Sequence, residues 1–97
     1  MDENLVREHA QAHADAVVAG DMKTAGNDLT TDAMQQAPDV MRALPRPTKS
    51  ASIESVTADG DLYVARILYS GDDNAAAVLS SWAEQEGRPM ITKLELV

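Results

Sequence analysis

The sequence contains no cysteine and no phenylalanine, and its only aromatic residues are two Tyr and one Trp. The missing cysteine excludes disulfides, thiolate zinc sites and cysteine nucleophiles, and is typical of a reducing compartment. No apolar run approaches the roughly 18 residues that a membrane span needs, and no basic segment precedes an apolar one at the start of the chain. We therefore expect a cytoplasmic protein without a signal peptide or a membrane-spanning helix.

Basic residues are also scarce, because 8 Lys and Arg stand against 16 Asp and Glu and leave a formal net charge of −8. A field of this sign repels phosphate backbones and anionic lipids, so neither nucleic acid nor a membrane is an expected partner. The 97 residues support a single domain, 1–97, with a core near the lower limit for independent folding. A partner subunit that covers more apolar surface would suit a chain of this length.

The first half of the chain has the periodicity and capping signals of helices. Residues 3–19 are rich in Ala, contain no Gly or Pro, and end at Gly20-Asp21, which combines a helix stop with a new N-cap. A second helix is expected over 21–29 and a short one from Thr31 or Asp32. Residues 38–44 should add a further turn before Pro45 and Pro47 end the helical half.

From Lys49 onward the apolar residues recur with a period of two, as in strands. Turn signals at Asp59-Gly60, at 71–74 and at Glu86-Gly87 divide this half into four strands, and such short connections make neighbouring strands antiparallel. We therefore expect an α+β fold, in which two to three N-terminal helices pack on a curved, cone-like, four-stranded antiparallel meander sheet.

The turn positions also set the register and hence the two faces of the sheet. They place Ile53 opposite Arg66, Arg66 opposite Leu79, Tyr63 opposite Trp82, and Leu79 opposite Leu94. One face is then aliphatic, with Ile53, Leu62, Val64, Leu68, Ala77, Leu79, Met90, Leu94 and Leu96 beside Arg66, Ser81 and Thr92. The other is aromatic, with Val56, Tyr63, Ile67, Tyr69, Val78, Trp82 and Ile91 ringed by Glu54, Glu84, Lys93 and Glu95.

Both faces are substantially apolar, but the helices can cover only one of them, so the other apolar face needs a second cover. We assign the helices to the aliphatic face, which carries fewer charges. Tyr and Trp side chains with a charged rim are typical of protein interfaces. The aromatic face is therefore predicted to form a homodimer interface, through the six residues Tyr63, Ile67, Tyr69, Val78, Trp82 and Ile91.

The order of helices and strands resembles the nuclear transport factor 2-like superfamily, also called SnoaL-like or cystatin-like α+β. The likeness spans most of the chain and is carried by segments 9–13 (HAQAH), 17–21 (VVAGD), 53–56 (IESV), 63–66 (YVAR), 81–84 (SWAE) and 87–91 (GRPMI). It implies a sheet folded around a long first helix, a conical pocket between them, and dimers formed through the outer sheet face. The superfamily includes isomerase-, dehydratase- and cyclase-like enzymes as well as non-catalytic binding domains. No position here matches the acid/base residues of those enzymes, so none is carried over.

His9 and His13 lie four residues apart on the apolar stripe of the first helix, which is a spacing that can place two imidazoles on one metal. The position after His9 is Ala10 instead of the catalytic Glu of a zincin, and no third ligand shares the face. We therefore predict no metal and no cofactor. The two histidines either line a small pocket as hydrogen-bonding or acid/base groups or are satisfied histidines of the core or interface.

Arg66 falls in the middle of a strand on the face assigned to the helices, where a guanidinium needs a partner. It either pairs with Asp28 or Asp32, or anchors an anionic ligand beside the two histidines. The predicted function is a homodimeric domain of this superfamily, non-catalytic or binding a small apolar or anionic ligand between the first helix and the aliphatic face, through His9, His13 and Arg66. One alternative is a small isomerase-, dehydratase- or cyclase-like enzyme with His9 or His13 as acid/base and Arg66 as electrostatic stabiliser. Another is a module that binds a different protein through the aromatic face.

Overall fold

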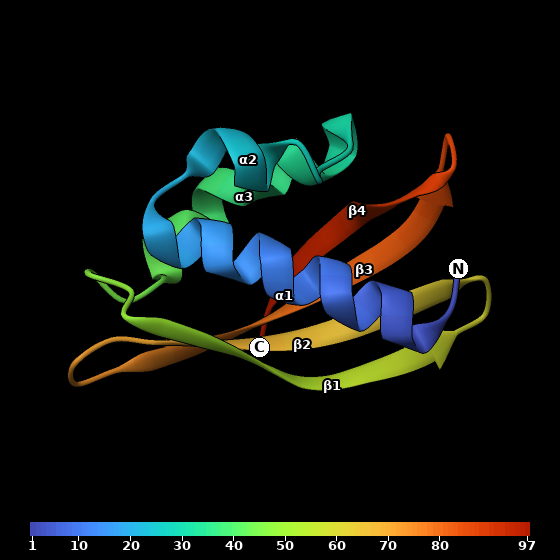
Figure 1. The fold of residues 1–97 in the computed structure, drawn as a ribbon. Helices are drawn as coiled ribbons and strands as arrows, with labels where there is room; N and C mark the ends of the chain where they lie inside the picture. Colours follow the sequence, from blue (N-terminus) through green and yellow to red (C-terminus); the bar gives the residue numbers. More distant parts are fainter.

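The computed structural model describes all residues 1–97 and has three helices followed by one four-stranded sheet. The helices are α1 (Glu3–Ala19), α2 (Met22–Gly26) and α3 (Thr31–Ala43), and the strands are β1 (Ser50–Asp59), β2 (Leu62–Ser70), β3 (Ala75–Gln85) and β4 (Arg88–Leu96). All strand pairs are antiparallel, in the order β1-β2-β3-β4. The expected α+β class and the meander are confirmed. Figure 1 shows that α1 to α3 all lie on one face of the curved sheet.

Each helix begins at a side chain that caps its free N–H groups. Asp2 accepts from the N–H of Leu5 at 2.8 Å, and Asp21 and Thr30 cap α2 and α3 in the same way. Gly20 ends α1 with a φ of 76°, a left-handed conformation that favours glycine. α3 runs without a break through Pro38, where two shorter pieces were expected. Pro38 lies on the exposed side of α3, so water can satisfy the carbonyl that its missing N–H leaves free.

The hairpins fall where the turn residues predicted, with positive φ at Gly60 and Gly87. The predicted pairs Tyr63–Trp82 and Arg66–Leu79 are confirmed. Two β-bulges were not predicted. One lies at Glu54, between Ile53 and Ser55, and places Ile53 opposite Ile67. The other lies at Thr92 and places Leu94 opposite Ser80. A bulge inserts one residue without altering the hairpin tips, so the turn positions alone give no sign of it.

The assignment of the helices to the aliphatic face was wrong. Trp82 and Ile91 are 0% exposed and Ile67 is 1% exposed, because the helices pack on the aromatic face, hereafter the inner face. Arg66 lies on the opposite, outer face. The bulges explain the error, since they turn Glu54, Lys93 and Glu95 from the rim of the inner face to the outer face. The inner face is then the less charged of the two, and it buries the largest side chain of the chain.

The core is one cluster of 17 buried hydrophobic residues between the helices and the inner face. α1 packs mainly over β1 and β2, whereas α3 packs over β4. The link between α2 and α3 is held on β4 as well, because the N–H of Ile91 donates to the carbonyl of Asp28 at 2.7 Å and the N–H of Thr30 donates to the carbonyl of Ile91 at 2.9 Å. None of the three helices is both long enough and apolar enough to cross a membrane.

Candidate ligand-binding pocket

A cavity of about 440 Å³ lies between the three helices and the inner face. Both sides contribute to its walls, and 13 of its 16 lining residues are hydrophobic. The lining consists of His13, Val17, Met22, Ala25, Gly26, Leu29, Met34, Ala37, Pro38, Val40, Met41, Leu44, Ile67, Tyr69, Val78 and Leu94. The volume falls within the range of about 300–1,000 Å³ that small-molecule sites occupy.

Three methionines of α2 and α3 line this cavity and are also exposed to solvent. Met22 is 43% exposed, Met34 is 52% exposed and Met41 is 36% exposed. Thioether side chains are unbranched and polarisable, so they adapt to apolar partners of different shapes. They form an apolar, deformable rim through which a ligand could enter.

His13 is one of the few polar groups in the lining and is only 6% exposed. Its Nδ1 lies 3.1 Å from Oδ2 of Asp28, and Oδ1 of the same carboxylate accepts a hydrogen bond from Arg88 at 2.6 Å. A carboxylate beside Nδ1 favours the tautomer with the proton on that nitrogen, which leaves Nε2 as an acceptor. The network therefore fixes the ring of α1 against the α2–α3 link and β4.

Tyr69 is the second polar group in the lining, at 3% exposure. Its hydroxyl makes no hydrogen bond to the protein. Every fully enclosed nitrogen or oxygen atom of a side chain in this structure does have a hydrogen-bond partner, so the Tyr69 hydroxyl is not fully enclosed. The hydroxyl must therefore be accessible, and the cavity is the hollow that Tyr69 lines. Burial raises the pKa of Tyr69 above its ordinary value of 10.0, so the phenol stays neutral and can donate a proton in a hydrogen bond.

His9 does not line the cavity, although it shares a helix face with His13. Its ring lies 6.5 Å from that of Trp82, centroid to centroid, and the His13 ring meets Trp82 edge-on at 6.2 Å. The indole Nε1 of Trp82 donates to Ser80 Oγ at 2.9 Å, and Ser80 Oγ donates to the carbonyl of Ala65 at 3.1 Å. Trp82 is thus a satisfied core residue, and of the two predicted histidines only His13 reaches the cavity.

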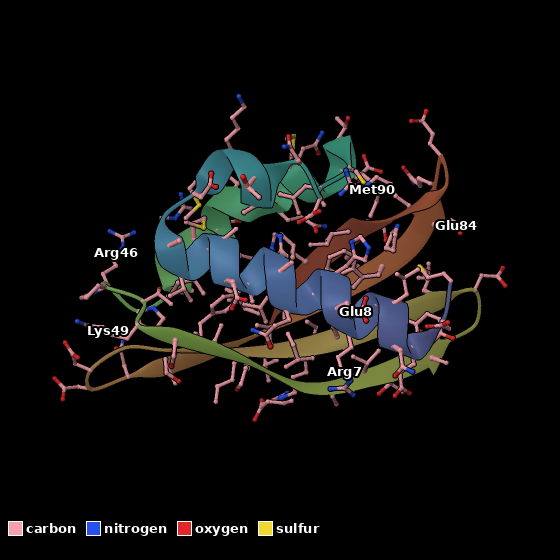
Figure 2. The ribbon with its side chains drawn as sticks, viewed as in Figure 1. Arg7, Glu8, Arg46, Lys49, Glu84 and Met90 are labelled. Carbon is pink, nitrogen blue, oxygen red and sulfur yellow. The ribbon has the colours of Figure 1, made fainter.

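Arg66 is not part of this site, which corrects its expected place beside the histidines. Its Nε donates to Glu54 at 3.0 Å on the outer face, so its partner is neither Asp28 nor Asp32. The cavity lining contains no Lys or Arg at all. Figure 2 shows two other cations, Arg46 and Lys49, pointing away from the protein at the loop between α3 and β1. An anionic ligand would find no free cation in the cavity.

The predicted interface residues are also placed differently. Of the six, Ile67, Tyr69, Val78, Trp82 and Ile91 are buried under the helices, and Tyr63 is half-buried on the same face. They cannot contact a partner while the helices are in place. Conversely, the sequence patterns did not point to Asp28 as the partner of His13 or to Arg88 as the partner of Asp28, since 60 residues separate Asp28 from Arg88. Only the docking of the α2–α3 link on β4 brings them together.

The outer face has a smaller hollow of about 300 Å³. It lies over the three strands β2 to β4 and the end of β1, and is lined by Asp59, Leu62, Val64, Leu79, Ser81, Lys93 and Glu95. Comparison of the chain with models of known protein families, with curated proteins and with solved structures found no match. The geometry of the two faces therefore carries the functional interpretation.

Proposed function

We propose that this chain is a homodimeric small-ligand-binding domain of the nuclear transport factor 2-like type, with its ligand in the cavity between the helices and the inner face. The observation that carries the proposal is the cavity itself, which has 13 hydrophobic residues among 16 and opens at the three exposed methionines. An apolar ligand would gain by leaving water, and His13 and Tyr69 would orient it. A cytoplasmic setting belongs to the same proposal, because a chain without cysteine is compatible with a reducing compartment.

The ligand site is tested with tetralin, a neutral bicyclic hydrocarbon, and a protein labelled with ¹³C at its methionine methyl groups. We expect tetralin to shift the signals of Met22, Met34 and Met41 and to raise the melting temperature. Ala37→Phe should fill the cavity and abolish both effects, since Ala37 lines it. Ala12→Phe is the matched control, because Ala12 lies on the exposed side of α1. Methionine signals that do not respond to tetralin at its solubility limit would contradict the proposal.

The dimer would form through the outer face, which no helix covers (Figure 1). Its centre is aliphatic and only half-buried, with Leu62, Val64, Leu68, Ala77 and Leu79. Arg66 lies among these residues, opposite Leu79, and pairs with Glu54, and Lys93 pairs with Glu95 on β4, so the face presents both signs of charge. A second copy related by a two-fold axis can place opposite charges against each other while the aliphatic centres meet.

Size-exclusion chromatography with light scattering at micromolar concentration tests the dimer. We expect twice the chain mass for the wild type and the mass of one chain for Leu79→Asp, which places a charge at the centre of the outer face. Ala12→Asp adds the same charge on the far side of α1 and should leave the dimer intact. A wild-type chain that elutes as a monomer would remove the dimer from the proposal, and the ligand site would stand on its own test.

A second candidate, an enzyme that transfers protons, is favoured by one observation, the pairing of His13 with Asp28. A carboxylate that holds Nδ1 leaves Nε2 free to accept a proton, which is the arrangement of a general base. His9 lacks such a partner, so of the two candidates His13 is retained. The test is deuterium exchange at the α-carbon of 1-tetralone in D₂O, followed by NMR. Exchange faster than in buffer that His13→Gln abolishes and His9→Gln leaves unchanged would establish catalysis.

The third expectation, a module that binds a different protein through its aromatic face, does not fit the structure, because that face is not at the surface. The residues that would form it are enclosed beneath α1 and α3, with Trp82 and Ile91 at 0% exposure. Exposing them would mean removing the helices and unfolding the core.

A further inference from the structure

We propose that the ligand is an uncharged carbonyl compound and that the Tyr69 hydroxyl donates a hydrogen bond to its carbonyl oxygen. This inference rests on the proposed function, because it names the ligand class of the same cavity. It adds a binding residue, Tyr69, and a chemical requirement that an apolar cavity alone does not impose.

The first support is the isolation of the Tyr69 hydroxyl. The two fully enclosed polar side chains of the inner face, Trp82 and Ser80, form hydrogen bonds within the protein through Nε1 and Oγ. Tyr69 is 3% exposed, and its hydroxyl, which is not fully enclosed, has no partner in the protein. An unpaired hydroxyl in an apolar site costs free energy, and a ligand atom that accepts its proton would restore the hydrogen bond. Occupation by a pure hydrocarbon would leave it unpaired and cut off from water.

The second support is that the hydroxyl acts as a donor. Because burial raises the pKa of Tyr69, the group holds its proton throughout the neutral range. A neutral phenol has one hydrogen to donate, and a ligand atom that accepts a hydrogen bond pairs with it. A carbonyl oxygen does so without a proton of its own, and the rest of the molecule can remain apolar, as the lining requires.

The third support is the absence of a counter-ion for an anionic ligand. No Lys or Arg lines the cavity, and Arg88 is held outside the lining by Asp28. Nδ1 of His13 lies against the same carboxylate, which would repel an anion bound next to the ring. A carboxylate ligand would lose its hydration without gaining a charged partner, whereas a neutral carbonyl loses far less.

The test compares tetralin, 1-tetralone and 1-naphthoate, three bicyclic molecules of similar size that carry no polar group, a ketone and a carboxylate respectively. For the wild type, one hydrogen bond predicts that 1-tetralone binds roughly three- to tenfold more tightly than tetralin, and that 1-naphthoate binds more weakly than 1-tetralone. In Tyr69→Phe the ketone should lose its advantage over the hydrocarbon. Tyr63→Phe is the matched control, because Tyr63 lies on the same strand outside the cavity and should leave all three affinities unchanged.

A second measurement does not depend on the variant. The infrared carbonyl stretch of 1-tetralone should fall on binding to the wild type relative to its value in an apolar solvent, and should return toward that value in Tyr69→Phe. The inference is overturned if the stretch does not fall, if Tyr69→Phe leaves the ketone preference intact, or if 1-naphthoate binds best. In those cases tetralin binding still supports the cavity as a ligand site. If tetralin does not bind either, the proposed function fails with the inference.

Discussion

The inner and outer faces belong to the same four strands and both carry aliphatic side chains, but they differ in what covers them. The inner face buries Trp82, Ile67 and Ile91 completely and meets the helices around a cavity. The outer face leaves its leucines half-buried and carries surface ion pairs such as Arg66–Glu54. The difference teaches that apolar content does not decide which face of a two-sided sheet becomes the core. The position of the charges decides it, and here two bulges set that position.

The largest expected effect of a single change comes from the centre of the inner face. Trp82→Ala should lower the free energy of unfolding by about 3–5 kcal/mol, because it removes a fully enclosed indole and leaves a void. The measurement is urea unfolding followed by circular dichroism. Leu79→Ala on the outer face is the matched change, and in the separated monomer it should cost clearly less. If Trp82→Ala does not fold, Ile67→Val replaces it as the change on the inner face and should lower the free energy of unfolding by about 0.5–1.5 kcal/mol. Equal losses on the two faces would contradict the asymmetry.

The next effect concerns the network that ties the helices to the inner face. Asp28→Ala should lower the free energy of unfolding by roughly 1–3 kcal/mol, since His13 and Arg88 both lose their partner. Asp73→Ala, in the exposed turn before β3, serves as the control for removing a carboxylate and should cost much less. Urea unfolding at pH 7 measures both. A loss for Asp28→Ala no larger than that of the control would show that the network does not stabilise the wall of the cavity.

A third prediction uses the raised pKa of Tyr69. Above a pH of about 10 the unfolded chain releases this proton while the folded chain retains it, so stability falls as the pH rises. One such group contributes a slope that approaches about 1.4 kcal/mol per pH unit at pH 11, and a total decline of about 1.4 kcal/mol between pH 9 and pH 11. Tyr69→Phe should remove that part of the decline, and Tyr63→Phe serves as the control variant. Urea unfolding at several pH values between about 9 and about 11 measures the slopes. Parallel curves for the wild type and Tyr69→Phe would contradict the raised pKa of Tyr69.

The smallest effect is expected on the outer face. Arg66→Met breaks a partly exposed ion pair and should change the free energy of unfolding by at most about 1 kcal/mol. It should leave the affinity for 1-tetralone unchanged, because Arg66 and the cavity lie on opposite faces of the sheet. A loss of ligand affinity in this variant would return Arg66 to the binding site and contradict the assignment of the faces. Titration by methionine methyl NMR measures it.

Much of the fold could be predicted because it depends on local signals. Capping residues such as Asp2 and Asp21 and the left-handed glycines mark the ends of elements within a few residues of chain. Less of the candidate site could be predicted from the sequence. His13 was identified from its place on the apolar stripe, but Tyr69 was assigned to the opposite role, because the faces were exchanged. The contacts of Asp28 with His13 and with Arg88 could not be predicted, since these residues meet only in the assembled fold.

The sequence by itself determined the order of helices and strands, the hairpin tips and the pairing at Tyr63–Trp82, because turn chemistry and hydrophobic periodicity act over short stretches. Only the tertiary structure decided which face the helices cover and, with it, where the cavity lies. The physical reason is that each bulge, at Glu54 and at Thr92, reverses the side on which the residues farther from the hairpin tip point. Whether a bulge forms depends on packing across the whole sheet, which the turn residues do not reveal.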